Sequence, residues 1–221
     1  HYPGDIEIIL VNNASTDRTR EIGLSFKGVS VVDEPVKGLV KARQAGFLAS
    51  TGDLIANIDA DTILPSGWIE KVMREFSRSK ELVALSGPCV YYDLSKGYNL
   101  LIRAYYYAWF FTHIVNQYIF HIDAMLQGGN FVLRREALKK IGGFDTRIAF
   151  YGEDADIARR IQKVGRVKFD FNLAAYSSGR RWRKEGLLTT TWRYFINYVW
   201  IHIFGRPFTK DYNDIRSEST L

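Results

Sequence analysis

The sequence predicts an α/β protein with a mostly parallel central sheet flanked by helices. Up to about residue 95, short apolar runs alternate with helical patterns, which is typical of parallel strands joined by crossover helices. The chain has 221 residues, 47% of them hydrophobic, enough for one sizeable core. It contains no internal repeat, low-complexity tract or linker, so we expect a single domain over residues 1–221.

The first half supplies most of the predicted sheet. We expect strands at residues 6–11, 29–35, 53–61 and 82–93, and helices at residues 15–26, 39–50 and 66–79. In the last of these helices an apolar stripe at helical spacing should face the sheet, made of Trp68, Ile69, Val72, Met73 and Phe76.

Beyond residue 95 the strict alternation stops. Residues 128–145 predict a short strand and then a helix ended by Gly142-Gly143. Residues 153–165 form an amphipathic helical pattern, with Ile157, Ile161 and Val164 inward, and residues 166–176 a last strand.

Two aromatic runs, at residues 105–122 and 187–204, frame this second half. Each is 18 residues long, near the minimum for a membrane-spanning helix, but each carries several polar side chains. We therefore expect buried or interfacial helices rather than spanning ones. Contact with a membrane surface and contact with a second copy of the chain both stay open.

Net charge narrows the class of partner, and cysteine content indicates the cellular compartment. Thirty Lys and Arg against 24 Asp and Glu give a net charge of +6, which suits an anionic ligand or reflects a chance surface excess. The aromatic residues cluster on apparent helices rather than alternating with basic residues on strands, so nucleic-acid binding fits less well. Cys89 is the only cysteine and the start shows no signal peptide, which favours a cytoplasmic protein, either free or at the inner face of a membrane.

Asp59 and Asp61 end the apolar run of the third predicted strand. Ligands of parallel α/β sheets bind beyond the carboxyl ends of the strands, and two side chains one residue apart on extended chain point the same way. Two such carboxylates suit Mn2+ or Mg2+, which take substrate phosphates as further ligands. On spacing alone, we favour a plainer role, with Asp59 capping a turn and Asp61 capping the next helix.

Four segments, in the order in which they occur along the chain, favour a cation-binding role for these two acids over the capping role. They are "IEIILVNNASTDRTREI", "KGLVKARQAGFLASTGDLIANIDADTILPSGWIEKV", "GGNFVLRREALKKIGGFD" and "FYGEDADIARRI". Together they resemble family 2 glycosyltransferases over roughly residues 5–170. The resemblance implies a nucleotide-sugar-binding fold of the GT-A type with helical acceptor-side additions. It also implies an inverting transfer of sugar from a nucleotide diphosphate to a hydroxyl of a glycan or lipid-linked acceptor.

The resemblance assigns roles to the matching residues. Asn12, with Asn13 beside it, matches the acidic pair that meets the nucleotide base. Asp59 should lie near the ribose or diphosphate, and Asp61 should hold the cation, Mn2+ or Mg2+. Asp154 matches the catalytic base. Its place at a predicted helix start favours the ionised form that a base needs. The same helix dipole would also favour an acidic residue at this position without any catalytic role.

Further residues are assigned to the two substrates. Glu153, Gly129 and Asn130 fall in acceptor-side segments of the resemblance. Arg43, like Lys37 and Lys41, is placed either at the diphosphate or on an exposed basic helix face. The basic run at 178–186 either supplies cations to the leaving diphosphate or is a solvated loop, and we expect the aromatic segments 98–126 and 187–204 to shape the acceptor side.

Three departures from the family pattern qualify this interpretation. Asn12-Asn13 replaces an acidic pair, which leaves the base identity open. The run "SGRRW" lacks the Gln of processive members, which argues against a long-chain polymerase. The family's first strand does not precede His1, so we expect a fragment of a longer protein, with a nucleotide-sugar-binding half at 1–95 and an acceptor-side half at 96–221. The rival hypothesis is a non-catalytic interaction domain on the same fold.

Overall fold

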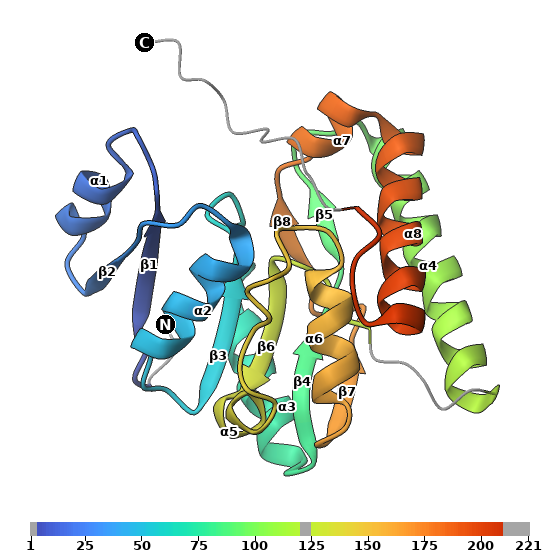
Figure 1. Cartoon of the computed structure of the whole chain (residues 1–221), viewed down its shortest axis with the longest axis horizontal. Coiled ribbons are helices and arrows are strands. Elements are labelled where there is room, and N and C mark those ends of the chain that lie inside the picture. The colour runs from blue at the N-terminus through green and yellow to red at the C-terminus, as the bar shows by residue number, and fades with distance from the viewer. Residues whose placement is uncertain (1–3, 120–124, 210–221) are drawn as a thin grey trace.

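The structure is a computed structural model that describes residues 4–119 and 125–209 (Figure 1). Its strands are β1 (Ile8–Asn13), β2 (Val29–Glu34), β3 (Leu54–Ile58), β4 (Leu82–Ser86), β5 (Cys89–Tyr91), β6 (Asn130–Arg134), β7 (Arg166–Phe169) and β8 (Ala175–Ser177). Its helices are α1 (Thr19–Ser25), α2 (Leu39–Ala49), α3 (Trp68–Arg78), α4 (Lys96–Ile119), α5 (Arg135–Lys140), α6 (Glu153–Ile161), α7 (Arg180–Glu185) and α8 (Leu187–Phe204).

A four-stranded sheet in the order β3-β6-β4-β7 forms the centre of the molecule (Figure 1). β6 runs antiparallel to β3 and β4, while β4 and β7 are parallel, so three of the four strands run the same way. Three strands therefore share the expected common direction, but the inserted, reversed β6 makes two of the three neighbouring pairs antiparallel. β6 has partners on both sides and is covered on both faces, which is why its Phe131, Val132 and Leu133 are all apolar and buried.

Helices cover both faces of this sheet. Trp68, Val72 and Phe76 of α3 pack with buried leucines of β4 on one face. Ile157 and Ile161 of α6 pack with Leu133 on the other. Two predicted core positions are wrong, because the side chain of Met73 is exposed and α6 ends at Ile161, which leaves Val164 beyond the helix and exposed.

Two of the predicted strands are each broken in two. The strand expected at 82–93 divides into β4 and β5 at Gly87-Pro88, and the strand expected at 166–176 divides into β7 and β8. β5 and β8 then pair in parallel as a separate two-stranded sheet. The break lies where Gly87 passes so close to the backbone of Leu173 that a Cβ would collide with it.

β1 and β2 form a third, parallel pair beside the central sheet (Figure 1). α2 packs against β1, with Gly46 close to Val11. α1 begins at Thr19, later than predicted, because the Asp17 carboxylate accepts the backbone N–H of Thr19 and holds the preceding residues in a turn.

The aromatic helices α4 and α8 lie side by side (Figure 1), with Trp109 of α4 in edge contact with Tyr198 of α8. α8 has the predicted bounds, whereas α4 begins at Lys96, well before the predicted start, and residues 120–122 of that prediction lie outside the described residues. Within the described part of the chain, no helix is long and apolar enough to cross a membrane. Contact with a membrane surface or a second copy stays a prediction.

Candidate active site

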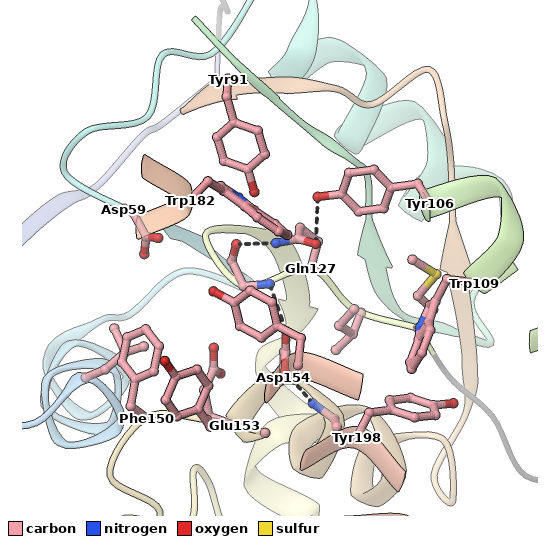
Figure 2. Close-up of a pocket in the computed structure, with 18 of the residues that line it drawn as sticks. Asp59, Tyr91, Tyr106, Trp109, Gln127, Phe150, Glu153, Asp154, Trp182 and Tyr198 are labelled. Atoms are coloured by element: carbon pink, nitrogen blue, oxygen red, sulfur yellow. Dashed lines mark hydrogen bonds between the residues drawn. The ribbon is translucent and has the colours of Figure 1, made fainter. Parts of the chain in front are cut away.

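A cavity of about 370 Å³ opens where the carboxyl end of β3 meets the start of α6 and the helices α4, α7 and α8 (Figure 2). Charged residues line one part of it, namely Arg43, Asp59, Asp61, Glu153, Asp154 and Arg180. Aromatic residues make up much of the rest, and among them Phe150 lies beside Glu153 (Figure 2); they are Tyr91, Tyr105, Tyr106, Trp109, Phe150, Tyr151, Trp182, Tyr194 and Tyr198. We call these two parts the charged end and the aromatic end.

Asp59 and Asp61 lie at the charged end, but not on extended chain as expected. β3 ends at Ile58, and the N–H of Thr62 donates to the carbonyl of Asp59 at 2.9 Å, which closes a turn around both acids. Both side chains nevertheless reach the cavity. The helix cap expected at Asp61 is absent, because α3 starts later, after Gly67 and without a side-chain cap.

Arg43 of α2 is the buried cation of the charged end. One guanidinium nitrogen contacts the carboxylate of Glu153, and another lies 3.6 Å from that of Asp59. The guanidinium also lies 5.1 Å from the ring centre of Phe131. Only 8% of the Arg43 side chain is exposed. Its main role in this structure is to join an acid that follows β3 to one that starts α6, rather than to form an exposed basic face.

Gly128 and Gly129 allow the acids to come together. Gly129 has φ +79°, a left-handed conformation, and a Cβ there would collide with the carboxylate of Asp59. A Cβ on Gly128 would lie 2.9 Å from an oxygen of Glu153. Both positions therefore need glycine for these carboxylates to converge, although the predicted acceptor contact of Gly129 is not tested by this geometry.

Asp154 lies in the first turn of α6, held by backbone donors. Its Oδ1 accepts the N–H of Ala155 at 2.9 Å, and its Oδ2 accepts the N–H of Gly128 at 3.3 Å (Figure 2). Burial raises the pKa of the Asp154 carboxyl, and these amides, with the nearby Arg43, oppose the rise. Burial thus works against the helix dipole, which by itself favours the ionised form.

Glu153 differs from Asp154 because its carboxylate contacts the charged guanidinium of Arg43, whereas that of Asp154 accepts from backbone N–H groups. Burial raises the pKa of Glu153 to about 8, and Arg43 opposes that shift without cancelling it. Asp156, the third acid of this turn, is 2% exposed and pairs with Arg160 at 2.7 Å and Arg159 at 3.4 Å. Of these three acids, only Asp154 lines the cavity without an ion pair within the described residues.

Asp61 pairs with Arg180, the first residue of α7, at 2.8 Å. The described residues contain no group of three or more His, Cys, Asp and Glu side chains able to hold a metal. Asp59 and Asp61 offer hard carboxylate oxygens, and their side chains are 43% and 30% exposed. This set fits Mn2+ or Mg2+ bound by one or two carboxylates, with diphosphate and water as the remaining ligands.

The aromatic end comes from segments far apart in the sequence. Tyr91 contacts Trp182 edge to face at 5.9 Å between ring centres, and Trp109 stacks on Tyr105 at 5.8 Å. The Tyr106 hydroxyl donates to Gln127 at 2.8 Å, next to the loop that binds Asp154 (Figure 2). Pyranose rings have apolar faces that stack on such surfaces, so this end suits a sugar or another partly apolar group.

Several cavity residues were not predicted. Phe150 and Tyr151 directly precede the Gly-Glu-Asp segment, and that position was the available signal. Tyr91 and Gln127 gave none, because a lone aromatic in a strand and a lone amide in a loop are normally structural. Arg180 was included only within the basic run 178–186.

Three predicted site residues lie elsewhere. The Asn12 amide donates to Asp33 at 2.8 Å, and Asn13 is bonded to the backbone of Gly38 at 2.7 Å and of Val36 at 2.8 Å. Neither lines the cavity. Asn130 has no exposed surface and is bonded to Trp68 and to three backbone carbonyls, so it holds the crossing strands together and presents no atom to an acceptor.

Known proteins resemble this chain in sequence. Residues 2–142 match the model "Glycosyl transferase family 2", and residues 113–176 match "N-terminal domain of galactosyltransferase". The chain is 26% identical over 215 residues to the probable glycosyltransferase YdaM of Bacillus subtilis, covering 87% of this chain and 46% of that protein. It is 36% identical over 81 residues to the uncharacterized glycosyltransferase Mb0553 of Mycobacterium bovis, 37% of each chain. It thus spans less than half the length of these relatives.

Solved structures share its fold. The mannosyltransferase PcManGT of Pyrobaculum calidifontis, in complex with GDP-Man and Mn2+, has a TM-score of 0.55 and 20% identity, over 80% of this chain and 50% of that one. Glucosyl-3-phosphoglycerate synthase of Mycobacterium tuberculosis, in complex with Mn2+, UDP-Glc and phosphoglyceric acid, has a TM-score of 0.56 and 16% identity, over 90% and 69%. These neighbours confirm the GT-A type of fold. Because the family model covers more than half of its residues, the chain belongs to glycosyl transferase family 2.

Proposed function

We propose that this chain carries the donor site and the catalytic base of an inverting, metal-dependent glycosyltransferase. The observation that carries the proposal is the position of Asp154, which belongs to the charged end of a cavity whose other lining side chains are largely aromatic. Its carboxylate is oriented by two backbone amides and has no ion-pair partner within the described residues. A general base needs this combination of fixed orientation and an unshared carboxylate.

The donor would lie at the charged end. Asp59 and Asp61 would hold the cation, which when bound would stabilise the negative charge that develops on the leaving diphosphate. Arg43 would keep Asp59 in place through their 3.6 Å contact. The structural neighbours hold GDP-Man or UDP-Glc together with Mn2+, which supports both the class of donor and the cation.

The acceptor would lie against the aromatic end. Its hydroxyl would give a proton to Asp154 while the oxygen attacks the anomeric carbon from the face opposite the leaving diphosphate. The C–O bond to the diphosphate breaks as the new glycosidic bond forms, so the configuration at that carbon inverts. Either a glycan or a lipid-linked sugar presents a ring of the kind these aromatic side chains can stack against.

Metal-dependent binding of a nucleoside diphosphate tests this proposal. UDP and GDP should bind more tightly with Mn2+ than with chelator, and Asp61→Asn should remove most of that difference. Because Asp61 is partly exposed and its side chain, among the described residues, pairs with Arg180 and weakly with Ser177, its replacement should hardly change the melting temperature. Asp53→Asn, at the opposite end of β3 and exposed, is the matched control. Unchanged metal dependence in Asp61→Asn would refute the assignment.

One observation favours the rival interaction domain. Large apolar side chains of α8 are exposed, with Leu188 at 85%, Ile203 at 65% and Trp192 at 61%. An assembly domain on this fold would self-associate, or pellet with anionic vesicles, and would bind nucleoside diphosphates no better with Mn2+ than with chelator. Sedimentation and vesicle pelleting beside the nucleotide titrations separate the two functions.

A further inference from the structure

Three arginines of α7 differ in what holds them. Arg181 lies 2.6 Å from the buried carboxylate of Glu185 and stacks 4.2 Å from the ring centre of Phe150. Arg183 pairs with Asp93 at 2.9 Å, away from the cavity. Only Arg180 lines the cavity, and its partner is Asp61, the acid assigned to the cation. The three side chains therefore provide an internal comparison within one short helix.

The Arg180–Asp61 pair is accessible and exchangeable. The side chains are 44% and 30% exposed, and the guanidinium takes Oδ2 of Asp61, while Ser177 approaches Oδ1 at 3.5 Å. An ion pair with this exposure contributes little free energy, so a divalent cation can replace it. A guanidinium bonded to Oδ2 takes up part of the negative charge of this carboxylate and repels a divalent cation placed at it, so each of the two cations weakens the binding of the other at Asp61.

We propose that Arg180 and the divalent cation compete for Asp61, and that the displaced guanidinium binds the diphosphate of the donor. This inference rests on the proposed function, since it takes Asp61 as the cation ligand. The planar guanidinium matches two phosphate oxygens at once, and Arg180 starts from a position beside the diphosphate site. Arg180 thereby neutralises Asp61 before the donor arrives and the diphosphate afterwards.

The test compares Arg180→Gln with Arg183→Gln, which removes the same charge from the same helix. Mn2+ binding alone is followed by electron paramagnetic resonance, and UDP and GDP binding by calorimetry at saturating Mn2+. For Arg180→Gln we expect Mn2+ to bind roughly three- to fivefold more tightly, because its competitor is gone. We expect nucleoside diphosphate to bind about tenfold more weakly, because a charged hydrogen-bond donor is lost. Arg183→Gln should stay within about twofold of the unmodified chain in both assays.

The opposite signs distinguish competition from a structural role, which would weaken both ligands. The inference is overturned if Arg180→Gln weakens Mn2+ binding, leaves it unchanged, or changes it as Arg183→Gln does. Absence of Mn2+ binding in both the unmodified chain and Arg180→Gln overturns it as well. If the unmodified chain binds Mn2+ but neither UDP nor GDP, the proposed function fails, while the Mn2+ titrations still decide whether Arg180 competes for Asp61.

Discussion

The two ends of the cavity are built from different kinds of structure. The acids of the charged end lie in two short stretches, the turn after β3 and the first turn of α6. The buried Arg43 links the two stretches through its contacts with Asp59 and Glu153. The aromatic end is made largely of the long helices α4 and α8 and of α7, and its rings are held by contacts with one another, such as Trp109 with Tyr198.

This difference suggests a division of labour. Ion pairs and hydrogen bonds from backbone N–H groups fix the positions of a few oxygen atoms. Binding a diphosphate and accepting a proton require oxygen atoms in fixed positions. Ring contacts between helices provide area and shape instead, which suits the recognition of an acceptor. Substitutions at the charged end should therefore change the chemical step or donor binding, and substitutions at the aromatic end should change acceptor affinity.

The largest expected effect is that of Asp154→Asn. Asparagine is nearly isosteric but does not accept a proton at neutral pH, so the transfer rate should fall by about 10²-fold or more. Donor affinity should stay within a few-fold. Because burial raises the pKa of Asp154, kcat/KM of the unmodified enzyme should rise with pH through a limb that lies above the ordinary Asp range. Transfer rates and donor titrations, made side by side, check both statements.

Asp156→Asn is the control for Asp154. Asp156 is buried and bonded to Arg159 and Arg160, so its loss should lower the free energy of unfolding by about 1–3 kcal/mol while the transfer rate of the folded protein stays near normal. Near-normal transfer by Asp154→Asn would remove it as the base.

A smaller effect is expected from Trp109→Ala at the aromatic end. The half-buried indole offers a face to the cavity, so its loss should raise the acceptor KM roughly three- to tenfold and leave donor affinity unchanged. Tyr107→Ala is the matched control, since Tyr107 stacks on Phe171 at 4.7 Å outside the cavity lining. The assay uses the glycan or lipid-linked sugar that supports transfer in an acceptor screen. Equal KM values for the two variants would contradict an acceptor role for the aromatic end.

The charged end was largely predictable from sequence. Its acids, Asp59, Asp61, Glu153 and Asp154, were identified through four ordered segments that resemble the family, whereas spacing alone favoured capping roles for Asp59 and Asp61. The partners of these acids were not identified. The contact of Arg43 with Glu153 joins residues more than a hundred positions apart, and the pairing of Asp61 with Arg180 spans a similar distance. Such pairs depend on the folded topology, which periodicity does not encode.

The errors in the fold have the same origin. The predicted strands 82–93 and 166–176 were each treated as continuous, because apolar runs on both sides of Gly87 look alike in sequence. The break follows from the close passage of Gly87 beside Leu173, a contact between distant segments. The reversed direction of β6 was equally invisible, since a strand buried on both faces shows the same apolar run in either orientation.

The smallest expected effect concerns Glu153 and the pH dependence of stability. Its ordinary pKa is 4.5 and burial raises the pKa to about 8 in the folded protein, so between these values the folded state binds more protons than the unfolded state. The stability contributed by this group is therefore fully present below about pH 4.5 and is lost as the pH rises through 8. Glu153→Gln does not titrate, so its urea midpoint should fall less between pH 5 and pH 8 than that of the unmodified chain.

Glu136→Gln is the control for this slope. Glu136 is exposed on α5 and bonded to Lys139 at 3.0 Å, which lowers the pKa of Glu136. Its contribution is present above the unfolded pKa and is lost only as the pH falls below that range, so Glu136→Gln should keep the slope of the unmodified chain between pH 5 and pH 8. Urea midpoints at four pH values measure all three proteins. Parallel slopes for the unmodified chain and Glu153→Gln would show that Arg43 keeps Glu153 ionised throughout, and that the charged end is held by a permanent ion pair.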